Sequence, residues 1–388
     1  MDFSESPELG MLRTAVAGLG ARYGHEYFVD RAKSGGNTRE LWAEAGKAGY
    51  LGVSVPEEYG GGGGGISELA VVCEEFATAG CPMLLMVVSP AICATVIARG
   101  GTAEQKQRWL PGFADGSVTM AFAITEPDAG SNSHRITTTA RRDGADWLLS
   151  GRKYYISGVD EAGAVLVVGR TEDAATGRLQ PALFIVPTDA PGFEYRQIPM
   201  EITSPEKQFT VFMDDVRLPA DALVGGGEYA SAGLAGLFAG LNPERITVAA
   251  YAAGIGRYAL SKGAAYAKDR AVWGTPIGAH QAIAHPLAAA KVQIELARLM
   301  MYKAAWLYDH GQDAECAEAA NMAKYAAAEA AIGAVDAAIQ SHGGNGMATE
   351  YGLATLWGGV RAARIAPVSR EMVLNFVAQH SLGLPKSY

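Results

Sequence analysis

One carboxylate stands out because it opens a long apolar, alanine-rich segment. In GLNPERITVAA, residues 240–250, Asn242 is a good helix N-cap, Pro243 suits the first helical position, and Glu244 falls in the first turn. The free amides of that turn favour a negative charge, so an ordinary helix start explains Glu244 without any chemistry. A buried carboxylate at the same place would have a raised pKa, as a general base needs. These residues alone leave both interpretations open.

Most other catalytic patterns are missing from the sequence. The seven histidines form no HExxH pair, so we expect no zinc or di-iron site. There is no Gly-x-Ser-x-Gly and no Walker loop, which argues against a hydrolase triad and a P-loop enzyme. The glycine-rich run YGGGGGGI, 59–66, has no adjoining lysine, and we expect a flexible loop between helices rather than a phosphate cradle.

Composition limits the class of protein. The chain has 388 residues, 49% of them hydrophobic, which suits two or three domains with a large core. The net charge of −9, with no basic block, argues against nucleic acid as a partner. The longest apolar runs are too short for membrane insertion, and the start lacks a signal-peptide pattern, so we expect a cytoplasmic protein. The four cysteines have no paired spacing and are predicted to be small buried hydrophobes.

Periodicity divides the chain into three regions. Residues 1–115 place apolar side chains three or four apart, which predicts an N-terminal helical domain. Residues 116–228 contain short alternating runs separated by turn signals, which predict strands in a compact antiparallel barrel or sandwich. Residues 229–388 return to long alanine-rich helical patterns and predict a helical bundle, with the boundary near GGGEYASAG, 225–233.

Four motifs, in this order and spacing, give the chain a resemblance to a known family. They are TEPDAGSN (125–132), RKYYISG (152–158), DRAVWGTPIGAHQAI (269–283) and QSHGGNGMATEYG (340–352). Together they resemble the acyl-CoA dehydrogenase family over nearly the whole length. The resemblance implies an α+β multidomain fold: an N-terminal helical domain, a middle antiparallel β-barrel and a C-terminal four-helix bundle.

The resemblance also implies a reaction. Family members use FAD to remove two hydrogens across Cα and Cβ of an acyl-CoA thioester, giving the trans-2-enoyl-CoA. A base takes the α-proton, the flavin N5 takes the β-hydride, and the electrons pass to an electron-transfer flavoprotein. The family shares FAD between subunits, which implies a homo-oligomer, either a tetramer or a dimer of dimers.

Several cofactor contacts carry over by resemblance to the middle domain. The turn at Gly130 and Ser131 is expected to offer donors to the flavin pyrophosphate and the edge of the substrate site. Tyr155 and Ser157 stand where the family usually has Trp and Thr, and they keep an aromatic face and a hydroxyl donor. By themselves these segments would be an ordinary turn and an exposed strand. The residues expected to line the isoalloxazine are Phe122, Ile124 and Thr125.

A second group of cofactor contacts lies in the C-terminal region. Arg270 is expected to meet the pyrophosphate of the FAD bound by a neighbouring subunit, with Trp273 covering the adenine or flavin side. The remaining positions implied by these motifs are Gln281, Gln340 and Gly344.

The resemblance changes the interpretation of Glu244. Many members carry the base in a C-terminal Tyr-Glu-Gly-Thr loop, but here Ala366, Pro367, Val368 and Ser369 occupy those positions. Isovaleryl-CoA and long-chain acyl-CoA dehydrogenases instead place it on the first helix of the bundle, directly before an arginine. Glu244 followed by Arg245 fits that arrangement. We therefore expect Glu244 to be the base, with Ser131 and Arg245 beside the substrate, and Ser369 and Glu371 beside the flavin.

Two departures and several alternatives remain. The family uses a backbone amide at the position of Pro367 to bind the thioester carbonyl, and proline has no N–H, so either Val368 donates or one donor is lost. Trp357-Gly358-Gly359 stands where Arg-Asp is usual.

An acyl-CoA oxidase, a nitroalkane oxidase, a reduced-flavin monooxygenase or a non-catalytic acyl-CoA or flavin binder would share these motifs. The acyl chain stays open, and the tail HSLGLPKSY resembles bacterial members.

Overall fold

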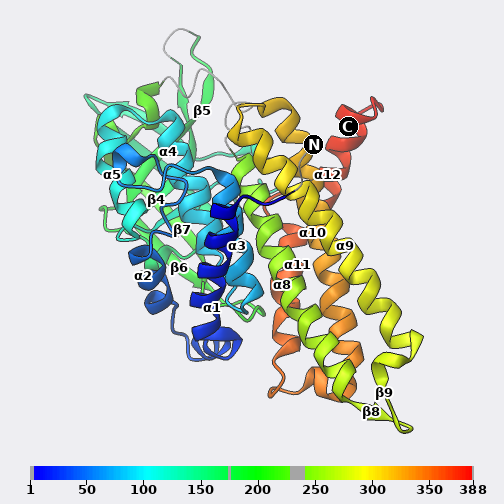
Figure 1. Ribbon diagram of the computed structural model, residues 1–388. Coiled ribbons are helices and arrows are strands. Elements are labelled where there is room, and N and C mark those ends of the chain that lie inside the picture. Colours follow the sequence, from blue (N-terminus) through cyan, green and yellow to red (C-terminus); the bar gives the residue numbers. More distant parts are fainter. Residues whose placement is uncertain (1–3, 174–175, 228–240, 387–388) are drawn as a thin grey trace.

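The computed structural model describes residues 4–173, 176–227 and 241–386, arranged as helices, a curled sheet and a second set of helices (Figure 1). The predicted order of the three regions is confirmed. The predicted boundary between residues 228 and 229 lies outside the described residues. The N-terminal elements are α1 Pro7–Lys33, α2 Arg39–Lys47, α3 Ile66–Thr78, the π-helical turn η2 Val87–Ala94, α4 Thr95–Gly100 and α5 Ala103–Asp115.

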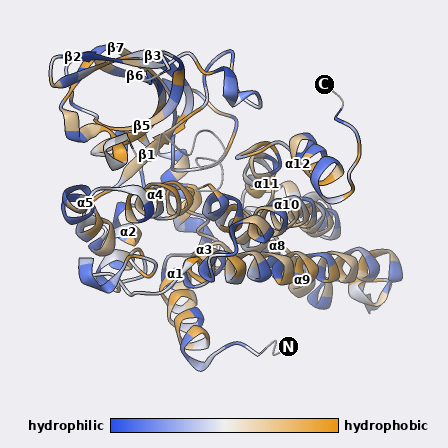
Figure 2. Ribbon diagram, turned by 90° about the horizontal axis from the view of Figure 1, so that it is seen from above, coloured by the Kyte–Doolittle hydropathy of each residue, from blue (hydrophilic) through white to orange (hydrophobic). Residues whose placement is uncertain are grey.

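Local signals start the N-terminal helices. Ser6 caps α1, its Oγ accepting from Leu9 N at 3.2 Å, and Pro7 takes the first helical position. Helix α3 is buried over nearly its whole length, because it packs against α1 on one side and against the C-terminal helices on the other (Figure 2).

The glycine run is closely packed, and the expectation of a flexible loop was wrong. Gly62 N and Gly64 N donate to Gly52 O and Val53 O, both at 2.9 Å. A Cβ at Gly61 would lie 2.1 Å from Val55 O, so only glycine fits against the neighbouring backbone. The run is therefore a fixed part of the N-terminal domain.

The middle region is a sheet that curls around its own core (Figure 2). The strand order is β1-β4-β2-β3-β7-β6, with β5 on β4. The expected β domain is confirmed, but its sheet is mixed rather than purely antiparallel, since β4 pairs in parallel with both β1 and β2. The strands are β1 Met120–Ala123, β2 Thr139–Asp143, β3 Asp146–Ser157, β4 Ala164–Glu172, β5 Leu179–Pro187, β6 Phe193–Ile198 and β7 Gln208–Leu218.

Within residues 241–386, three long helices, α8, α9 and α10, pack against one another through small side chains. A Cβ at Gly256 of α8 would lie 3.2 Å from Ala331 Cα of α10, which shows how close the two backbones are. The predicted helical domain is confirmed, and α11, which the sequence analysis did not predict, packs on α10 and α8. The described elements of the C-terminal domain are α8 Asn242–Asp269, the hairpin β8 Ala271–Val272 and β9 Thr275–Pro276, α9 Gln281–Asp309, α10 Asp313–His342, α11 Leu356–Ile365 and α12 Arg370–Phe376, followed by the π-helical turn η10 Val377–Ser381.

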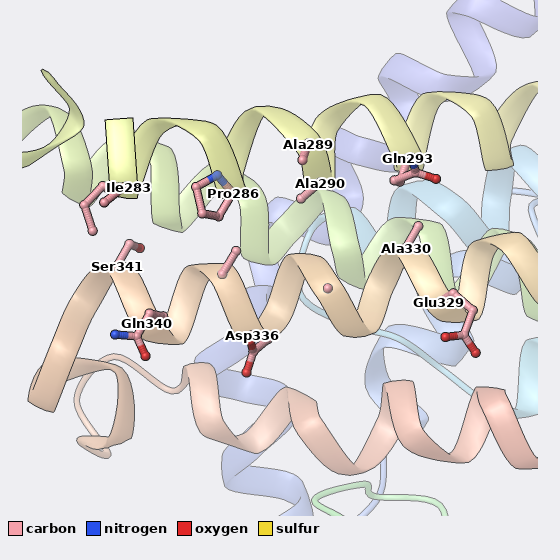
Figure 3. A pocket seen from close by; sticks show the side chains of 13 residues that line it. Ile283, Pro286, Ala289, Ala290, Gln293, Glu329, Ala330, Asp336, Gln340 and Ser341 are labelled. Atoms are coloured by element: carbon pink, nitrogen blue, oxygen red, sulfur yellow. The ribbon is translucent and has the colours of Figure 1, made fainter. Parts of the chain in front are cut away.

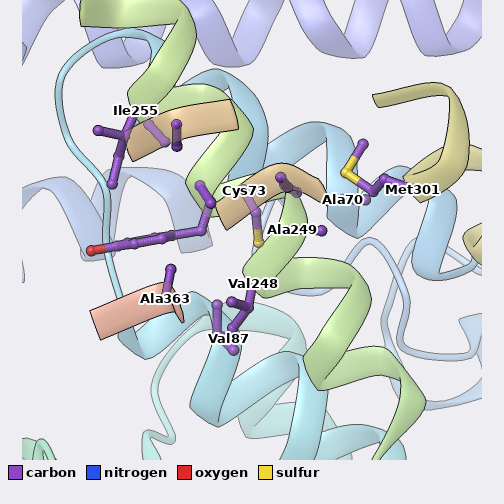
Figure 4. Packing of buried hydrophobic residues seen from close by; sticks show 14 of the residues in the cluster. Ala70, Cys73, Val87, Val248, Ala249, Ile255, Met301 and Ala363 are labelled. Carbon is purple, nitrogen blue, oxygen red and sulfur yellow. The ribbon is translucent and has the colours of Figure 1, made fainter. Parts of the chain in front are cut away.

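Helix α8 joins the N-terminal and C-terminal domains. Its buried face contributes Val248, Ala249 and Ile255 to one core that also contains Val87 of η2 and Ala363 of α11 (Figure 4). All four cysteines are buried, as predicted. Across the described residues, the helices are too short or too polar to cross a bilayer.

We predict that Gly254→Ala destabilises the protein. Its Cβ would lie 2.4 Å from Glu74 O and 2.5 Å from Ala77 Cβ of α3, and forcing two packed helices apart costs about 1–3 kcal/mol. The measurement is the shift of the thermal unfolding midpoint. Gly18→Ala, at an exposed position of α1, is the control. Nothing lies within 4 Å of its Cβ, and alanine stabilises a helix by up to about 1 kcal/mol relative to glycine. Equal midpoints for the two variants would contradict this account.

Candidate active site

Glu244 lies in the first turn of α8 and is half-buried. Burial raises the pKa of its carboxyl to about 7, and the positive charges of Arg245 and Lys324 partly oppose that rise. The thiol of Cys93, on η2, also faces this carboxylate, and burial together with the Glu244 charge raises the pKa of that thiol. Glu244 can therefore exchange a proton near neutral pH.

Asn242 does not cap α8, and that prediction was wrong. It is the first helical residue, and its Oδ1 accepts a hydrogen bond from Arg245 Nη1 at 3.0 Å. Both residues are buried, so the asparagine oxygen satisfies part of a guanidinium that has left water. Asn242 therefore fixes the cation next to Glu244.

Lys324 of α10 contacts the loop of residues 366–369, and its positive charge also acts on the Glu244 carboxyl. Its Nζ donates to Arg364 O at 3.2 Å and to Val368 O, and the residue is 1% exposed. Burial lowers the pKa of the ammonium to about 8, against the opposing effect of the Glu244 charge. The sequence analysis missed Lys324. Lys324 lies four residues after Ala320 and three residues before Ala327, both buried, so it shares the apolar face of α10. That spacing is the sequence signal that indicates its burial.

The loop that Lys324 contacts leads into α12. Ser369 caps that helix, its Oγ accepting from Met372 N at 3.3 Å. Glu371 follows in the first turn and is exposed, near enough to Lys324 to raise the pKa of the ammonium. The structure therefore brings Glu244, Arg245, Ser369 and Glu371 to one end of the C-terminal domain.

The predicted middle-domain residues lie at the end of β1 and at a bulge of β3. Tyr154 N donates to Thr125 O at 2.9 Å, which holds the bulge beside Ile124 and Thr125. Tyr155 has a φ of 57° there and is 50% exposed, so its ring lies at the surface. Ser157 Oγ exchanges hydrogen bonds with Gln208, and Phe122 is buried in β1.

The turn after β1 is held by a buried ion pair that the sequence analysis missed. Glu126 accepts from Lys153 Nζ at 3.0 Å and from the backbone amides and hydroxyls of Thr137 and Thr138. Burial alone would raise the pKa of Glu126, but the Thr138 hydrogen bond and the Lys153 charge lower it to about 2. This pair positions the exposed Gly130 and Ser131, and no short-range sequence pattern identifies it.

The remaining predicted residues lie at the far end of the C-terminal domain. Arg270 ends α8, 26 residues after Glu244, so roughly 39 Å of helix separates the two. Trp273, in the β8–β9 hairpin, is 90% exposed. Gln281 and Gly344 are exposed near the same end, and Gln340 lines a groove of about 390 Å³ between α9 and α10 (Figure 3). One chain therefore presents two separate groups of predicted residues.

Family models for the acyl-CoA dehydrogenase N-terminal, middle and C-terminal domains match residues 6–117, 121–216 and 232–382. The chain belongs to the acyl-CoA dehydrogenase family. Acyl-CoA dehydrogenase FadE12 of Mycobacterium tuberculosis (strain ATCC 25618 / H37Rv) is 66% identical over 386 residues, covering 100% of this chain and 99% of that protein. The inferred resemblance is confirmed.

Two solved structures support the same assignment. Butyryl-CoA dehydrogenase from Megasphaera elsdenii has a TM-score of 0.91 at 28% identity, over 98% of this chain and 100% of that chain. The FAD complex of PigA has a TM-score of 0.91 at 26% identity, over 99% of this chain and 100% of that chain. The fold is therefore that of acyl-CoA dehydrogenases.

The middle-domain residues fit a flavin. A flavin needs a planar contact for its ring system and hydrogen-bond donors for its pyrophosphate. The exposed ring of Tyr155 beside Thr125 offers the first, and the exposed turn at Gly130 and Ser131 offers the second. Across the described residues, no cluster of His, Cys, Asp and Glu side chains suits a metal ion.

We predict that Glu126→Gln lowers both stability and flavin content. The variant leaves the Lys153 ammonium buried without its counter-charge, and breaking a buried pair costs about 3–5 kcal/mol. The measurements are the thermal midpoint and the ratio of flavin to protein absorbance after purification. Asp128→Asn, an exposed change in the same turn, is the control and is expected to match the native protein. Native values in Glu126→Gln would show that the pair does not hold the turn.

Proposed function

We propose that the protein is an FAD-dependent acyl-CoA dehydrogenase in which Glu244 removes the α-proton of the thioester. The observation that carries this proposal is the half-buried Glu244 carboxyl, whose pKa of about 7 suits a base at neutral pH. The loop position where many relatives carry a carboxylate is Pro367 in this chain. FAD, when bound, supplies the acceptor for the β-hydride.

The flavin would be held by the middle domain and the nearby end of the C-terminal domain. Tyr155 would contact its ring system, and Gly130 and Ser131 would donate hydrogen bonds to its pyrophosphate. Ser157 and Glu371 are further polar contacts in this proposal. Phe122, Ile124, Thr125 and Ser369 would complete the wall.

Glu244 acts by taking the proton from Cα onto a carboxylate oxygen, while the C–H electron pair moves toward the Cα–Cβ bond. Arg245 and Lys324 keep part of the Glu244 population ionised before this step. The negative charge that develops on the thioester carbonyl needs a donor. Pro367 has no N–H, and we propose the amide of Val368 for this role.

The proposed enzyme is a homo-oligomer, as a tetramer or dimer of dimers. Roughly 39 Å of helix separates Arg270 from Glu244, too far for both to contact one cofactor in one chain. Arg270, Trp273, Gln281, Gln340 and Gly344 would then contact the FAD of a neighbouring copy. An electron-transfer flavoprotein is the proposed acceptor, and a bacterial cytoplasm the proposed location.

We predict that Glu244→Gln abolishes flavin reduction without abolishing thioester binding. The amide keeps the shape of the side chain but cannot accept a proton, so the rate is expected to fall by about 10²–10⁴, as for a lost base. The measurement is anaerobic bleaching of the flavin band by a panel of acyl-CoA thioesters. Glu315→Gln, also in the first turn of a helix but exposed, is the matched control and should bleach as the native protein does. Bleaching by Glu244→Gln at the native rate would exclude Glu244 as base.

We also predict that flavin reduction speeds up as pH rises through about 7. The folded carboxyl has a pKa raised above its usual value, so the active, ionised form is lost as pH falls below about 7. The rate should fall roughly tenfold per pH unit on the acid side and level off on the alkaline side. Stopped-flow absorbance between pH 5 and 9, at roughly unit steps, measures this profile. A rate that stays constant across that range would contradict the assignment.

A further inference from the structure

A buried lysine occupies the centre of the alanine-rich helix α10. Lys324 is among the largest fully buried side chains, beside alanines that allow α8 and α10 to approach closely. An ammonium group in such a place costs several kcal/mol unless it has partners. The packing of α10 does not require a positive charge at this position. The groups that interact with Lys324 therefore indicate what its ammonium does.

The first partners are two backbone carbonyls of the C-terminal loop region. Arg364 O belongs to the last turn of α11, where helix carbonyls lack intrahelical donors, and Val368 O immediately precedes the cap of α12. Lys324 therefore ties both ends of the 366–369 loop to α10. This loop occupies the place where many relatives carry the catalytic carboxylate.

The second partner is electrostatic. Glu244 and Arg245 face Lys324 from α8, Glu371 faces it from α12, and Glu329 faces it from its own helix. Glu329 is engaged by Arg364 and Arg370, and Glu371 is exposed, so solvent weakens its effect. Around Glu244 itself the charged and titratable groups are Arg245, Lys324 and the thiol of Cys93. Of the three carboxylates near Lys324, Glu329 is paired with arginines of α11 and α12 and Glu371 is exposed, whereas Glu244 is half-buried.

We propose that Lys324 is a positioning residue for the proposed dehydrogenation: its ammonium anchors the 366–369 loop and favours the ionised form of Glu244. The proposal rests on the proposed function. Lys324 does not touch the reacting atoms. It acts by holding Val368, the proposed carbonyl donor, and by stabilising the charge that Glu244 must carry before it takes the proton.

The test removes the ammonium in two ways. Lys324→Met keeps most of the side-chain volume without charge or donors, and Lys324→Gln keeps a donor for a loop carbonyl without charge. Because glutamine can still donate a hydrogen bond to the 366–369 loop, we expect Lys324→Gln to fold even if Lys324→Met does not. Lys47→Met, an exposed lysine in the last turn of α2, is the control.

Two readouts separate electrostatics from stability. The first is the pH profile of anaerobic flavin reduction: its midpoint should move upward by about 1 in both variants, since a neighbouring opposite charge shifts a carboxyl pKa by about 1–3. The rate at pH 7 should then fall roughly fivefold, because the ionised fraction of Glu244 drops from about one half to about one tenth, and it should recover at alkaline pH in Lys324→Gln, whereas Lys324→Met also loses limiting rate. The second readout is an infrared titration of the carboxyl band that Glu244→Gln removes, made on the cofactor-free protein, where the same upward move is expected.

The opposite results are equally specific. A carboxyl midpoint unchanged in both variants, or a rate lowered by the same factor at every pH, would overturn the proposal and leave Lys324 a structural residue. If the native flavin is bleached by no acyl-CoA, the proposed function fails, and the catalytic role of Lys324 fails with it even where the infrared midpoint moves. Native bleaching with an unmoved infrared midpoint overturns the role of Lys324 alone.

Discussion

The close packing of α8 is the constraint on which the rest of the structure depends. This helix of 28 residues contacts α3, α9 and α10, and it can approach them closely because many of its buried positions are glycine and alanine. Dispersion attraction falls steeply with separation, so small residues let the backbones themselves make the contact, as Gly254 does with Glu74 O. A helix held this tightly fixes both of its ends, and those ends carry Glu244 and Arg270. The two groups of predicted residues, roughly 39 Å apart, are thereby positioned by one packed helix.

Two buried carboxylates and the half-buried Glu244 show how differently the same fold treats a negative charge. Glu74 is contacted by Arg13, Arg257 and Arg298, and Glu126 by Lys153 and two threonines, and in both cases these partners lower the carboxyl pKa despite burial. Glu244 has two cations near it but, in the described part of the chain, accepts no side-chain hydrogen bond, and burial raises its pKa to about 7. In Glu74 and Glu126 neighbouring positive charges and directed hydrogen bonds act together to stabilise the ionised form, whereas at Glu244 the nearby charges act alone.

The sequence predicted what depends on local periodicity and missed what depends on tertiary contact. The strands and the three long helices bury one face or both, so their apolar spacing identified them. Helix α11 was missed because Gly358 and Gly359 weaken its helical pattern, and they are explained only by packing, since a Cβ at Gly358 would lie 3.1 Å from Ile202 Cα. Asn242 had the residue type of a cap, yet the neighbouring guanidinium took its oxygen. The partners of Lys324 and Glu126 could not be predicted from local sequence. Those of Lys324 lie 40 and 44 residues away, and those of Glu126 lie 11 to 27 residues away.

The first turn of a helix is an unusual place for a base, because its free amides ordinarily stabilise the ionised carboxylate and lower its basicity. Here burial outweighs that effect, while Arg245 and Lys324 keep the charge from being lost altogether. A carboxylate carried on a loop would depend on the loop for its position, whereas Glu244, the proposed base, takes its position from a packed helix. Lys324 contacts the loop of residues 366–369 and its charge also acts on the Glu244 carboxyl, so this loop and the first turn of α8 are physically coupled through one side chain.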